Sequence, residues 1–196
     1  MTVFGKRSVP AQAGVWIAGA LALPLLALGA FLCDLQLSGN FHTVVPGELY
    51  RAAQPTPRQL QEYADKYGVK SVINLRGPHD GFAWYEAEKA ENAKLGIKQI
   101  DFRVSSITEM DSKEIARLVA IMRQARKPLL VHCQSGADRS GLVSALYLAA
   151  INGVDIKEAA RQLSIRYGHF SMPFSRTYAM DLTLQAFGAA SAQPSS

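Results

Sequence analysis

The residues best suited to catalysis lie in one short segment, residues 132–140, whose sequence is HCQSGADRS. The segment follows an apolar run at residues 128–131 and precedes a helical pattern that starts near Ser140. A strand that ends in a tight loop before a helix directs several backbone N–H groups, and the positive end of the helix, toward one point. The segment therefore predicts a loop that binds a doubly charged oxyanion.

A nucleophile and a cation accompany the predicted loop. Cys133 lies at its base, and thiolates are stabilised at helix N-termini and beside arginine. Arg139 follows after five intervening residues, and its planar guanidinium can hold two phosphate oxygens at once. A thiolate beneath a bound phosphate can form a phospho-cysteine, a mechanism that needs no metal ion and no cofactor. The segment thus predicts a hydrolase, and the alternative is a buried cysteine at the end of a core strand.

The other loop residues are predicted to bind the substrate through their backbone. Their amides, together with the Arg139 guanidinium, would hold the three equatorial oxygens of the phosphoryl group. The predicted substrate-binding residues are Gln134, Ser135, Gly136 and Ala137.

The pattern His-Cys-five residues-Arg-Ser resembles the signature of the cysteine-dependent protein tyrosine and dual-specificity phosphatases, of a bacterial membrane-anchored or exported type. The likeness continues in residues 49–55 and 72–76 and spans residues 45–170. It implies a phosphomonoester hydrolase that acts on a phosphorylated protein or a small phosphomonoester. Ser140 resembles the hydroxyl that helps the thiolate leave, and its other expected role is a helix N-cap. His132 resembles the histidine before the nucleophile, with a positioning role.

The general acid that protonates the leaving group is left between two aspartates. Related dual-specificity enzymes place an aspartate on a loop well before the cysteine. Asp101 lies 32 residues before Cys133, but the pattern puts it inside a strand. Asp138 ranks first, because the Asp-Arg-Ser end of the loop resembles the Asp-Arg-Thr of myotubularin-type lipid phosphatases and some secreted bacterial phosphatases, whose loop aspartate is a proposed acid. Its alternative role is a local contact that fixes Arg139 or the loop amides.

Two other functions stay open. The Asp138-Arg139 pair suggests a phosphoinositide or inositol-phosphate phosphatase, which basic residues around the mouth of the cleft would distinguish. A catalytically silent phospho-binding module tethered to the membrane is the second alternative, and the intact Cys133 and Arg139 disfavour it. Further residues are considered for the cleft lining, although each type is more commonly a surface or packing residue. They are Arg51, Arg76, Trp84, Tyr85 and Arg166.

The N-terminal segment at residues 14–33 contains no charged residue, and the Trp16 indole is its one polar side chain. Twenty helical residues reach about 30 Å, the thickness of a bilayer's hydrocarbon core. Because Lys6 and Arg7 precede the segment, we expect a membrane anchor with residues 1–13 in the cytoplasm and the catalytic domain exported to the periplasm. A cleaved signal peptide is the alternative, but the apolar stretch is long for one and residues 28–30 form a poor cleavage site.

Strand and helix patterns alternate through the rest of the chain. Helices are predicted from Pro57 to Gly68 and at residues 84–94, 141–151, 155–167 and 178–187, with a further helix after the capping box at Asp111. Strands are predicted at residues 69–75, 97–104 and 128–131, after a connector at residues 34–45. These patterns predict an α/β phosphatase domain over residues 45–187, with a small, mostly parallel central sheet flanked by helices on both faces. Residues 188–196 are predicted to be a disordered tail, and residues 166–169 a helix end capped by Gly168.

The charge distribution argues against a nucleic-acid partner. The net charge is +5, and the basic residues are interspersed with acidic ones rather than grouped in a polybasic tract. The expected partners are therefore a phosphorylated substrate and, through the N-terminal helix, a membrane.

Overall fold

The computed structural model describes residues 11–191 of the chain, with side chains described for residue 20 and from residue 22 onward. A five-stranded sheet has the spatial order β1-β2-β5-β3-β4. Its strands are β1 (His42–Val45), β2 (Leu49–Ala52), β3 (Ser71–Asn74), β4 (Lys98–Asp101) and β5 (Leu129–His132). The β1–β2 pair is antiparallel and the other three pairs are parallel, so the predicted mostly parallel sheet is confirmed.

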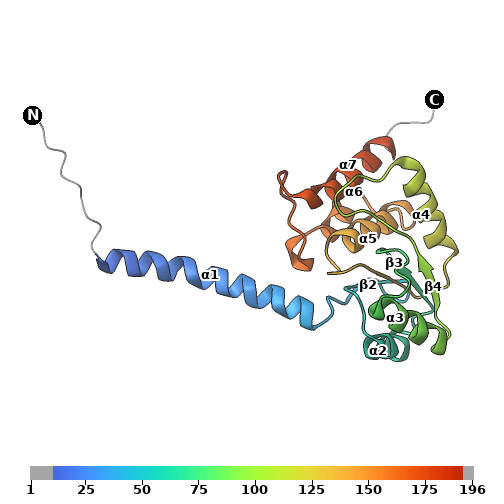
Figure 1. The fold of residues 1–196 in the computed structure, drawn as a ribbon. Helices are drawn as coiled ribbons and strands as arrows, with labels where there is room; N and C mark the ends of the chain where they lie inside the picture. Colours follow the sequence, from blue (N-terminus) through green and yellow to red (C-terminus); the bar gives the residue numbers. More distant parts are fainter. Residues whose placement is uncertain (1–10, 192–196) are drawn as a thin grey trace, which may run out of the picture.

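Helices cover both faces of the sheet (Figure 1). On one face lie α2 (Pro57–Tyr67) and α3 (Ala83–Lys94), and on the other lie α4 (Ser112–Gln124), α5 (Asp138–Ala150), α6 (Ile156–Ala159) and α7 (Ala179–Ser191). Side chains alternate along the central strand β5: Leu130 packs in the core beneath α2, whereas Leu129 and Val131 pack in the larger core beneath α5. Both faces of β5 are apolar because both are buried, as expected for a central parallel strand.

The predicted starts of α2 and α4 are confirmed. Thr56 caps α2 in a capping box with Gln59, and Pro57 takes the first helical position. Asp111 caps α4 in the same way, with Glu114 as its reciprocal partner. Gly68 ends α2 with φ of 66°, in the left-handed region that favours glycine. Local spacing therefore determines where these helices begin and end.

The helix predicted over residues 155–167 is wrong. The structure has the short helix α6 followed by two 3₁₀ turns, Ala160–Gln162 and Ile165–Tyr167. The Gln162 carbonyl accepts a hydrogen bond from the buried Arg51 guanidinium, at 2.7 Å, and Leu163 leaves the helical region with ψ of 80°. A partner distant in sequence therefore takes a carbonyl that a continuous helix would use.

Other predicted boundaries also move. The predicted connector holds the end of α1 (Ala11–Leu37) and β1, which forms a hairpin with β2. The predicted strand at residues 97–104 ends at Asp101, and α5 starts at Asp138 instead of Gly141. The predicted tail is helical as far as Ser191, because Gly188 of α7 packs closely against Ile156. Residues 192–196 lie outside the described residues.

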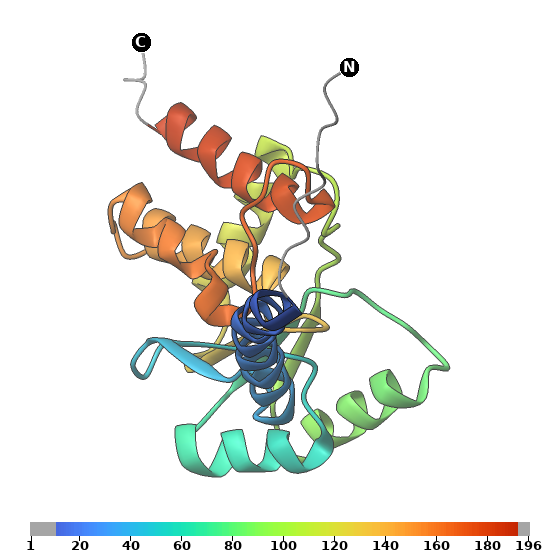
Figure 2. The same cartoon turned by 90° about the vertical axis from the view of Figure 1, so that its left-hand side faces the viewer.

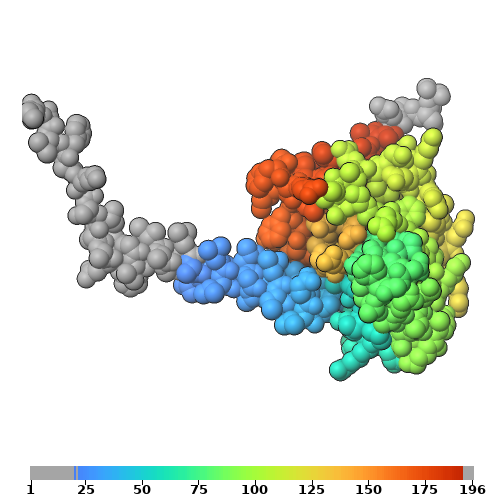
Figure 3. Space-filling model, viewed as in Figure 1, coloured from blue at the N-terminus to red at the C-terminus, as the bar shows by residue number. Residues whose placement is uncertain are grey.

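Helix α1 projects from the domain, as the side view of Figure 1 and the end-on view of Figure 2 show, and its C-terminal end packs against the domain (Figure 3). Leu35 is 5% exposed there, whereas Leu23, Leu25 and Leu26 are about 70% exposed. Among the residues whose side chains are described, no helix combines the length and apolar character needed to cross a membrane. Of the predicted anchor, residues 14–19 and 21 lie outside that set, and residues 1–10 of the predicted cytoplasmic lead lie outside the described residues altogether.

Candidate active site

The segment at residues 133–137 forms a loop at the carboxyl end of β5, directly before α5. His132 is in register with Ala52 of β2 on one side and Asn74 of β3 on the other. Because neighbouring parallel strands end at the same edge of a sheet, the segments that follow β2 and β3 lie beside the loop. The predicted strand-loop-helix arrangement around Cys133 is confirmed.

The loop carbonyls are held by donors from elsewhere in the chain. The Gln134 carbonyl accepts from the Gln54 amide at 3.2 Å, and the Ser135 carbonyl accepts from Asn40 Nδ2 at 2.9 Å. Arg51 Nη2 donates to both the Gly136 and Ala137 carbonyls, at 2.8 and 2.9 Å. Within the described part of the chain, the amides of residues 134–137 donate no hydrogen bond. The loop therefore uses its carbonyls for support and leaves its amides open to an anion.

Arg51 supports the loop from beneath and is fully buried. Its Nη1 donates to the Gln162 carbonyl and side-chain oxygens, and its guanidinium stacks at 4.1 Å on the Tyr167 ring. Burial lowers the pKa of Arg51 to about 10, although Tyr167, Cys133 and Asp138 oppose the shift. The sequence predicts a surface or packing role for this arginine, whereas the structure makes it the principal support of the loop.

Two glycines allow the loop and its surroundings to approach closely. Gly136 has φ of 75°, and a Cβ there would lie 2.7 Å from the Ala53 amide nitrogen and 2.8 Å from the Ala52 carbonyl carbon. A Cβ at Gly141 would lie 2.8 Å from the Gln162 carbonyl oxygen. Both contacts involve backbone, which cannot move aside cheaply, so this packing requires glycine.

Cys133 lies at the base of the loop and is 1% exposed. Burial alone would also fit the alternative of a core cysteine, but its surroundings are cationic. The charge that Cys133 can carry partly offsets the lowering of the pKa values of Arg51 and Arg76, so both guanidinium groups lie within electrostatic range of the sulfur. Arg139, partly exposed, places Nη1 3.4 Å from the Leu75 carbonyl oxygen. Cys133 therefore lies at the base of a loop with open amides and within electrostatic range of two guanidinium groups, a setting typical of a nucleophilic cysteine and not of an inert core cysteine.

A chain of buried polar contacts links the histidine before the nucleophile to the rim of the site. His132 Nε2 lies 2.8 Å from Glu88 Oε1, and both side chains are fully buried. Gln54 donates to Glu88 Oε2 at 2.6 Å and accepts from Arg76 Nη1 at 2.9 Å. The guanidinium of Arg76 stacks 3.5 Å above the Trp84 ring. The network fixes His132 from behind, in agreement with the positioning role implied for it.

Glu88 and Gln54 were not identified from the sequence. Glu88 is one of several charged residues in its helix, and no local pattern distinguishes it from those on the solvent side. Arg76 and Trp84 were candidates for the cleft lining, and the structure places them beside the loop. Burial chiefly lowers the pKa of Arg76, and the neighbouring Arg139 lowers it further.

The structure moves Asp101 from the interior of a strand to its end. It is the last residue of β4, at the edge where the loop lies. Its carboxylate accepts from the Tyr85 hydroxyl at 2.6 Å, from Asn74 Nδ2 at 2.9 Å and from Gln99 Nε2 at 3.3 Å. Burial is the main cause that raises the pKa of Tyr85, and its hydrogen bond to Asp101 is the next. Three donors thus hold Asp101.

Asp138 is the first residue of α5, and its partner was not predicted. Its Oδ1 lies 2.7 Å from His169 Nδ1, and His169 Nε2 lies 2.8 Å from Asp181 Oδ2. The predicted cap at Gly168 is confirmed, although it ends a 3₁₀ turn, with φ of 84°. The histidine that follows, His169, is buried, and no local pattern in the sequence indicates this.

Ser140 was expected as a helix N-cap, and that expectation is wrong, because α5 begins two residues earlier and Ala137 takes the cap position. The Ser140 hydroxyl donates to the Ala52 carbonyl at 3.3 Å, which ties the loop to β2. Its assistance to the departing thiolate stays a prediction. Among the described residues, no group of three His, Cys, Asp or Glu side chains is arranged to hold a metal ion.

Comparison with known proteins identifies a family model over most of the domain. The model described as "Dual specificity phosphatase, catalytic domain" matches residues 49–180. The dual specificity protein phosphatase TpbA of Pseudomonas aeruginosa strain PAO1 is 29% identical over 137 residues. That match covers 67% of this chain and 55% of TpbA, so the chain spans about half the length of this relative.

Solved structures show the same fold. The crystal structure of P. aeruginosa TpbA superposes with a TM-score of 0.59 at 20% identity, covering 80% of this chain and 92% of TpbA. A TpbA variant in complex with pTyr gives the same TM-score at 19% identity, covering 80% and 93%. PTPMT1 in complex with PI(5)P gives 0.55 at 18% identity, covering 78% of this chain and 99% of PTPMT1.

Proposed function

The chain belongs to the dual-specificity phosphatase family, and we propose that it hydrolyses phosphomonoesters through a phospho-cysteine on Cys133. One observation carries this proposal: the carbonyls of residues 134–137 are held by donors from elsewhere in the chain, while the amides of the same residues are open and Arg139 follows them in the first turn of α5. Preorganised donors of this kind stabilise the charge that develops on equatorial phosphoryl oxygens.

The reaction proceeds in two displacements. The Cys133 sulfur attacks phosphorus, and an S–P bond forms as the P–O bond to the leaving group breaks. The leaving oxygen takes a proton from a general acid, for which Asp138 and Asp101 remain the candidates. Water then attacks the phospho-cysteine, the S–P bond breaks, and phosphate departs with the thiolate restored.

The proposed substrate is a phosphorylated tyrosine or serine/threonine side chain of a protein. TpbA, the relative with the same fold, has been seen with pTyr. The Trp84 ring beneath Arg76 adds an aromatic surface beside the loop.

A phosphoinositide is the second candidate substrate. Arg76 lies close enough to Arg139 to lower its own pKa through that charge, so two guanidinium groups stand beside the loop. A substrate with more than one phosphate could place one phosphate against each guanidinium group. PTPMT1, which shares the fold, has been seen with PI(5)P.

We further propose that residues 14–33 anchor the protein in a membrane and that the catalytic domain is exported. The support is the uncharged composition of this segment, the basic residues before it and the helical conformation of α1. Membrane insertion would also cover the exposed leucines of α1.

A substrate panel tests the proposed function. The full chain, solubilised in detergent, should release phosphate from p-nitrophenyl phosphate at a rate that EDTA does not change. A phosphotyrosine peptide, a phosphoserine peptide and micellar PI(5)P should then be compared by kcat/KM. Preference for the peptides supports a protein phosphatase, and preference for PI(5)P supports the lipid alternative. Phosphate binding without turnover of any substrate would indicate the silent module instead.

Substitution of Asp138 by asparagine is expected to separate substrates by leaving group. If Asp138 is the general acid, turnover of an alkyl phosphate such as phosphoserine should fall by about 10²–10⁴-fold. Turnover of p-nitrophenyl phosphate should change little, because p-nitrophenolate leaves without a proton. Asp101→Asn is the matched variant, and the acid is the aspartate whose loss produces this split. Equal losses on both substrates would dismiss Asp138 as the acid.

A further inference from the structure

His169 is a buried histidine held between two carboxylates from different helices. Its side chain is fully buried, while the side chains of Asp138 and Asp181 are 22% and 13% exposed. Nδ1 lies 2.7 Å from Asp138 Oδ1, and Nε2 lies 2.8 Å from Asp181 Oδ2. The three side chains therefore form a continuous line from the start of α5 to α7.

The two short contacts require two shared protons. A neutral imidazole carries one N–H, so against two ionised carboxylates its bare nitrogen would face an oxygen lone pair. Both contacts become hydrogen bonds if the imidazole is doubly protonated between two carboxylates. They also do so if Asp138 is protonated and donates to Nδ1 while Nε2–H donates to Asp181. These two forms hold the same number of protons and differ only in the position of one.

We propose that His169 holds the proton that Asp138 delivers to the leaving group, and that Asp181 keeps His169 protonated. This inference rests on the proposed phosphatase function and makes His169 and Asp181 positioning residues that act through Asp138. It also resolves a difficulty, because an ionised carboxylate at the loop would repel a phosphate dianion and could not act as an acid.

The proton transfers balance over the two displacements. When the substrate dianion occupies the loop, it repels an ionised Asp138 carboxylate, and transfer of the Nδ1 proton to Oδ1 removes this repulsion. Asp138 then gives that proton to the leaving oxygen, which leaves Asp138 ionised and His169 neutral with Nε2–H on Asp181. In the second displacement Asp138 takes a proton from the attacking water and returns it to Nδ1. His169 is then doubly protonated between two carboxylates, as it was before the reaction.

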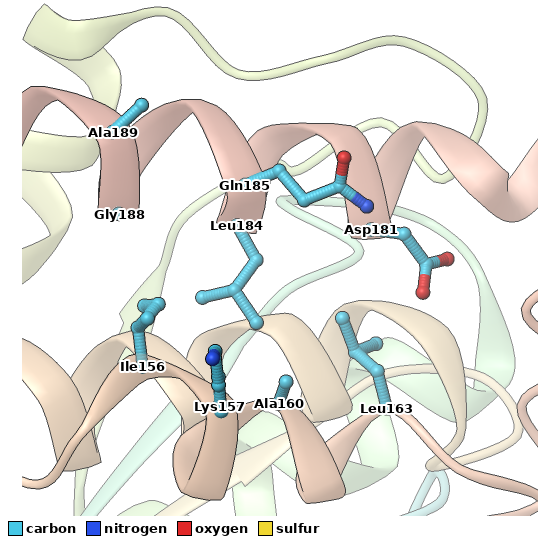
Figure 4. Close-up of a pocket in the computed structure, with 9 residues that line it drawn as sticks. All are labelled: Ile156, Lys157, Ala160, Leu163, Asp181, Leu184, Gln185, Gly188 and Ala189. Carbon is cyan, nitrogen blue, oxygen red and sulfur yellow. The ribbon is translucent and has the colours of Figure 1, made fainter.

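Asp181, at the α7 end of this line of three side chains, lines a cavity. A cavity of about 300 Å³ lies between α6 and α7, and Asp181 and Lys157 are the charged residues among those that line it (Figure 4). Figure 4 shows the Asp181 side chain projecting from α7 beside Leu163. Asp181 thus connects the buried histidine to a space that water can enter.

The surroundings of His169 favour its charged form. Burial is the largest single influence and lowers its pKa, but hydrogen bonds and charge from Asp138 and Asp181 together outweigh burial, so the pKa is raised. The charged groups that act on His169 are Asp138 of α5 and Asp181 of α7. Arg51 of β2, His42 of β1 and Arg166 instead pack against the ring of Tyr167, two residues before His169. Because the pKa of His169 is raised, His169 is protonated below that pKa and loses its proton as the pH rises through it.

Two variants of the full chain test this proton relay, in which Asp181 keeps His169 protonated and His169 supplies the proton to Asp138. Asp181→Asn keeps an acceptor for Nε2–H but removes a charge, so the pKa of His169 should fall. The basic limb of the kcat profile for phosphoserine should then move about one to two pH units lower, while the profile for p-nitrophenyl phosphate stays in place. His169→Gln should lower phosphoserine turnover by about 10²-fold and p-nitrophenyl phosphate turnover by less than about threefold. Glu158→Gln on α6 is the control and should move neither profile.

A measurement without turnover completes the test. The NMR titration of His169 in Cys133→Ser should shift when phosphotyrosine binds, because the dianion draws the Nδ1 proton toward Asp138. The basic limb of the kcat profile does not move in Asp181→Asn if His169 plays no part in proton transfer, and a folded His169→Gln variant then loses turnover equally on both substrates. These two results together would show that His169 only holds α5 against α7. That result overturns the relay alone. If wild type turns over no substrate, it is the proposed function that fails.

Discussion

Replacing Cys133 by serine is expected to abolish turnover of every phosphomonoester while phosphate binding survives. The serine hydroxyl is far less acidic than a thiol and forms no nucleophilic anion near neutral pH. We expect kcat to fall by about 10³-fold or more, as when an enzyme loses its nucleophile. The open amides and Arg139 are untouched, so the loop should still hold a dianion.

The measurement combines kcat for p-nitrophenyl phosphate with a Kd for phosphotyrosine by calorimetry. Cys33→Ser is the matched control, because Cys33 is the other free cysteine, is exposed on α1 and should leave both quantities unchanged. Rapid acid quenching of the wild type should trap a phospho-enzyme that the Cys133 variant does not form. Retention of more than about a tenth of the activity in Cys133→Ser would rule out the covalent mechanism.

Substitution of Arg51 by methionine is expected to destabilise the fold and to disable the loop together. Leaving a buried hydrogen-bonding group without its partner costs about 1–3 kcal/mol, so the loss of several partners at once amounts here to about 3–5 kcal/mol. The carbonyls of Gly136, Ala137 and Gln162 would lose their donor. For a chain of this size the loss corresponds to a fall in Tm of about 10 °C. Turnover should fall even at temperatures where the variant is folded, since loop carbonyls freed from Arg51 can turn inward.

Thermal unfolding by circular dichroism and kcat at 15 °C together check this prediction. Arg126→Met is the control, because Arg126 is exposed and should change neither value appreciably. Arg51→Lys should recover part of the stability but little of the activity, since an ammonium does not reproduce the fork that bonds two loop carbonyls and Gln162 at once. A Tm within 2 °C of wild type in Arg51→Met would contradict the support role.

Features that depend on short-range spacing were predictable from the sequence. The loop at Cys133, the cap at Thr56 and the capping box at Asp111 each rest on residues a few positions apart. Steric and hydrogen-bonding rules at that range hold whatever the rest of the chain does. The alternation of apolar strands and amphipathic helices likewise led to the mostly parallel sheet.

Tertiary structure alone decided which residues support that loop. Arg51 is 85 residues from Gly136, and Glu88 is 44 residues from His132, so no local pattern could pair them. His169 meets Asp138 across 31 residues, only because the predicted helix at residues 155–167 breaks and returns the chain to the start of α5. A nucleophile and its anion cradle can be encoded locally, because neighbouring amides form them. The buried charges around them depend on which distant segments share one desolvated space, and folding of the whole chain determines that.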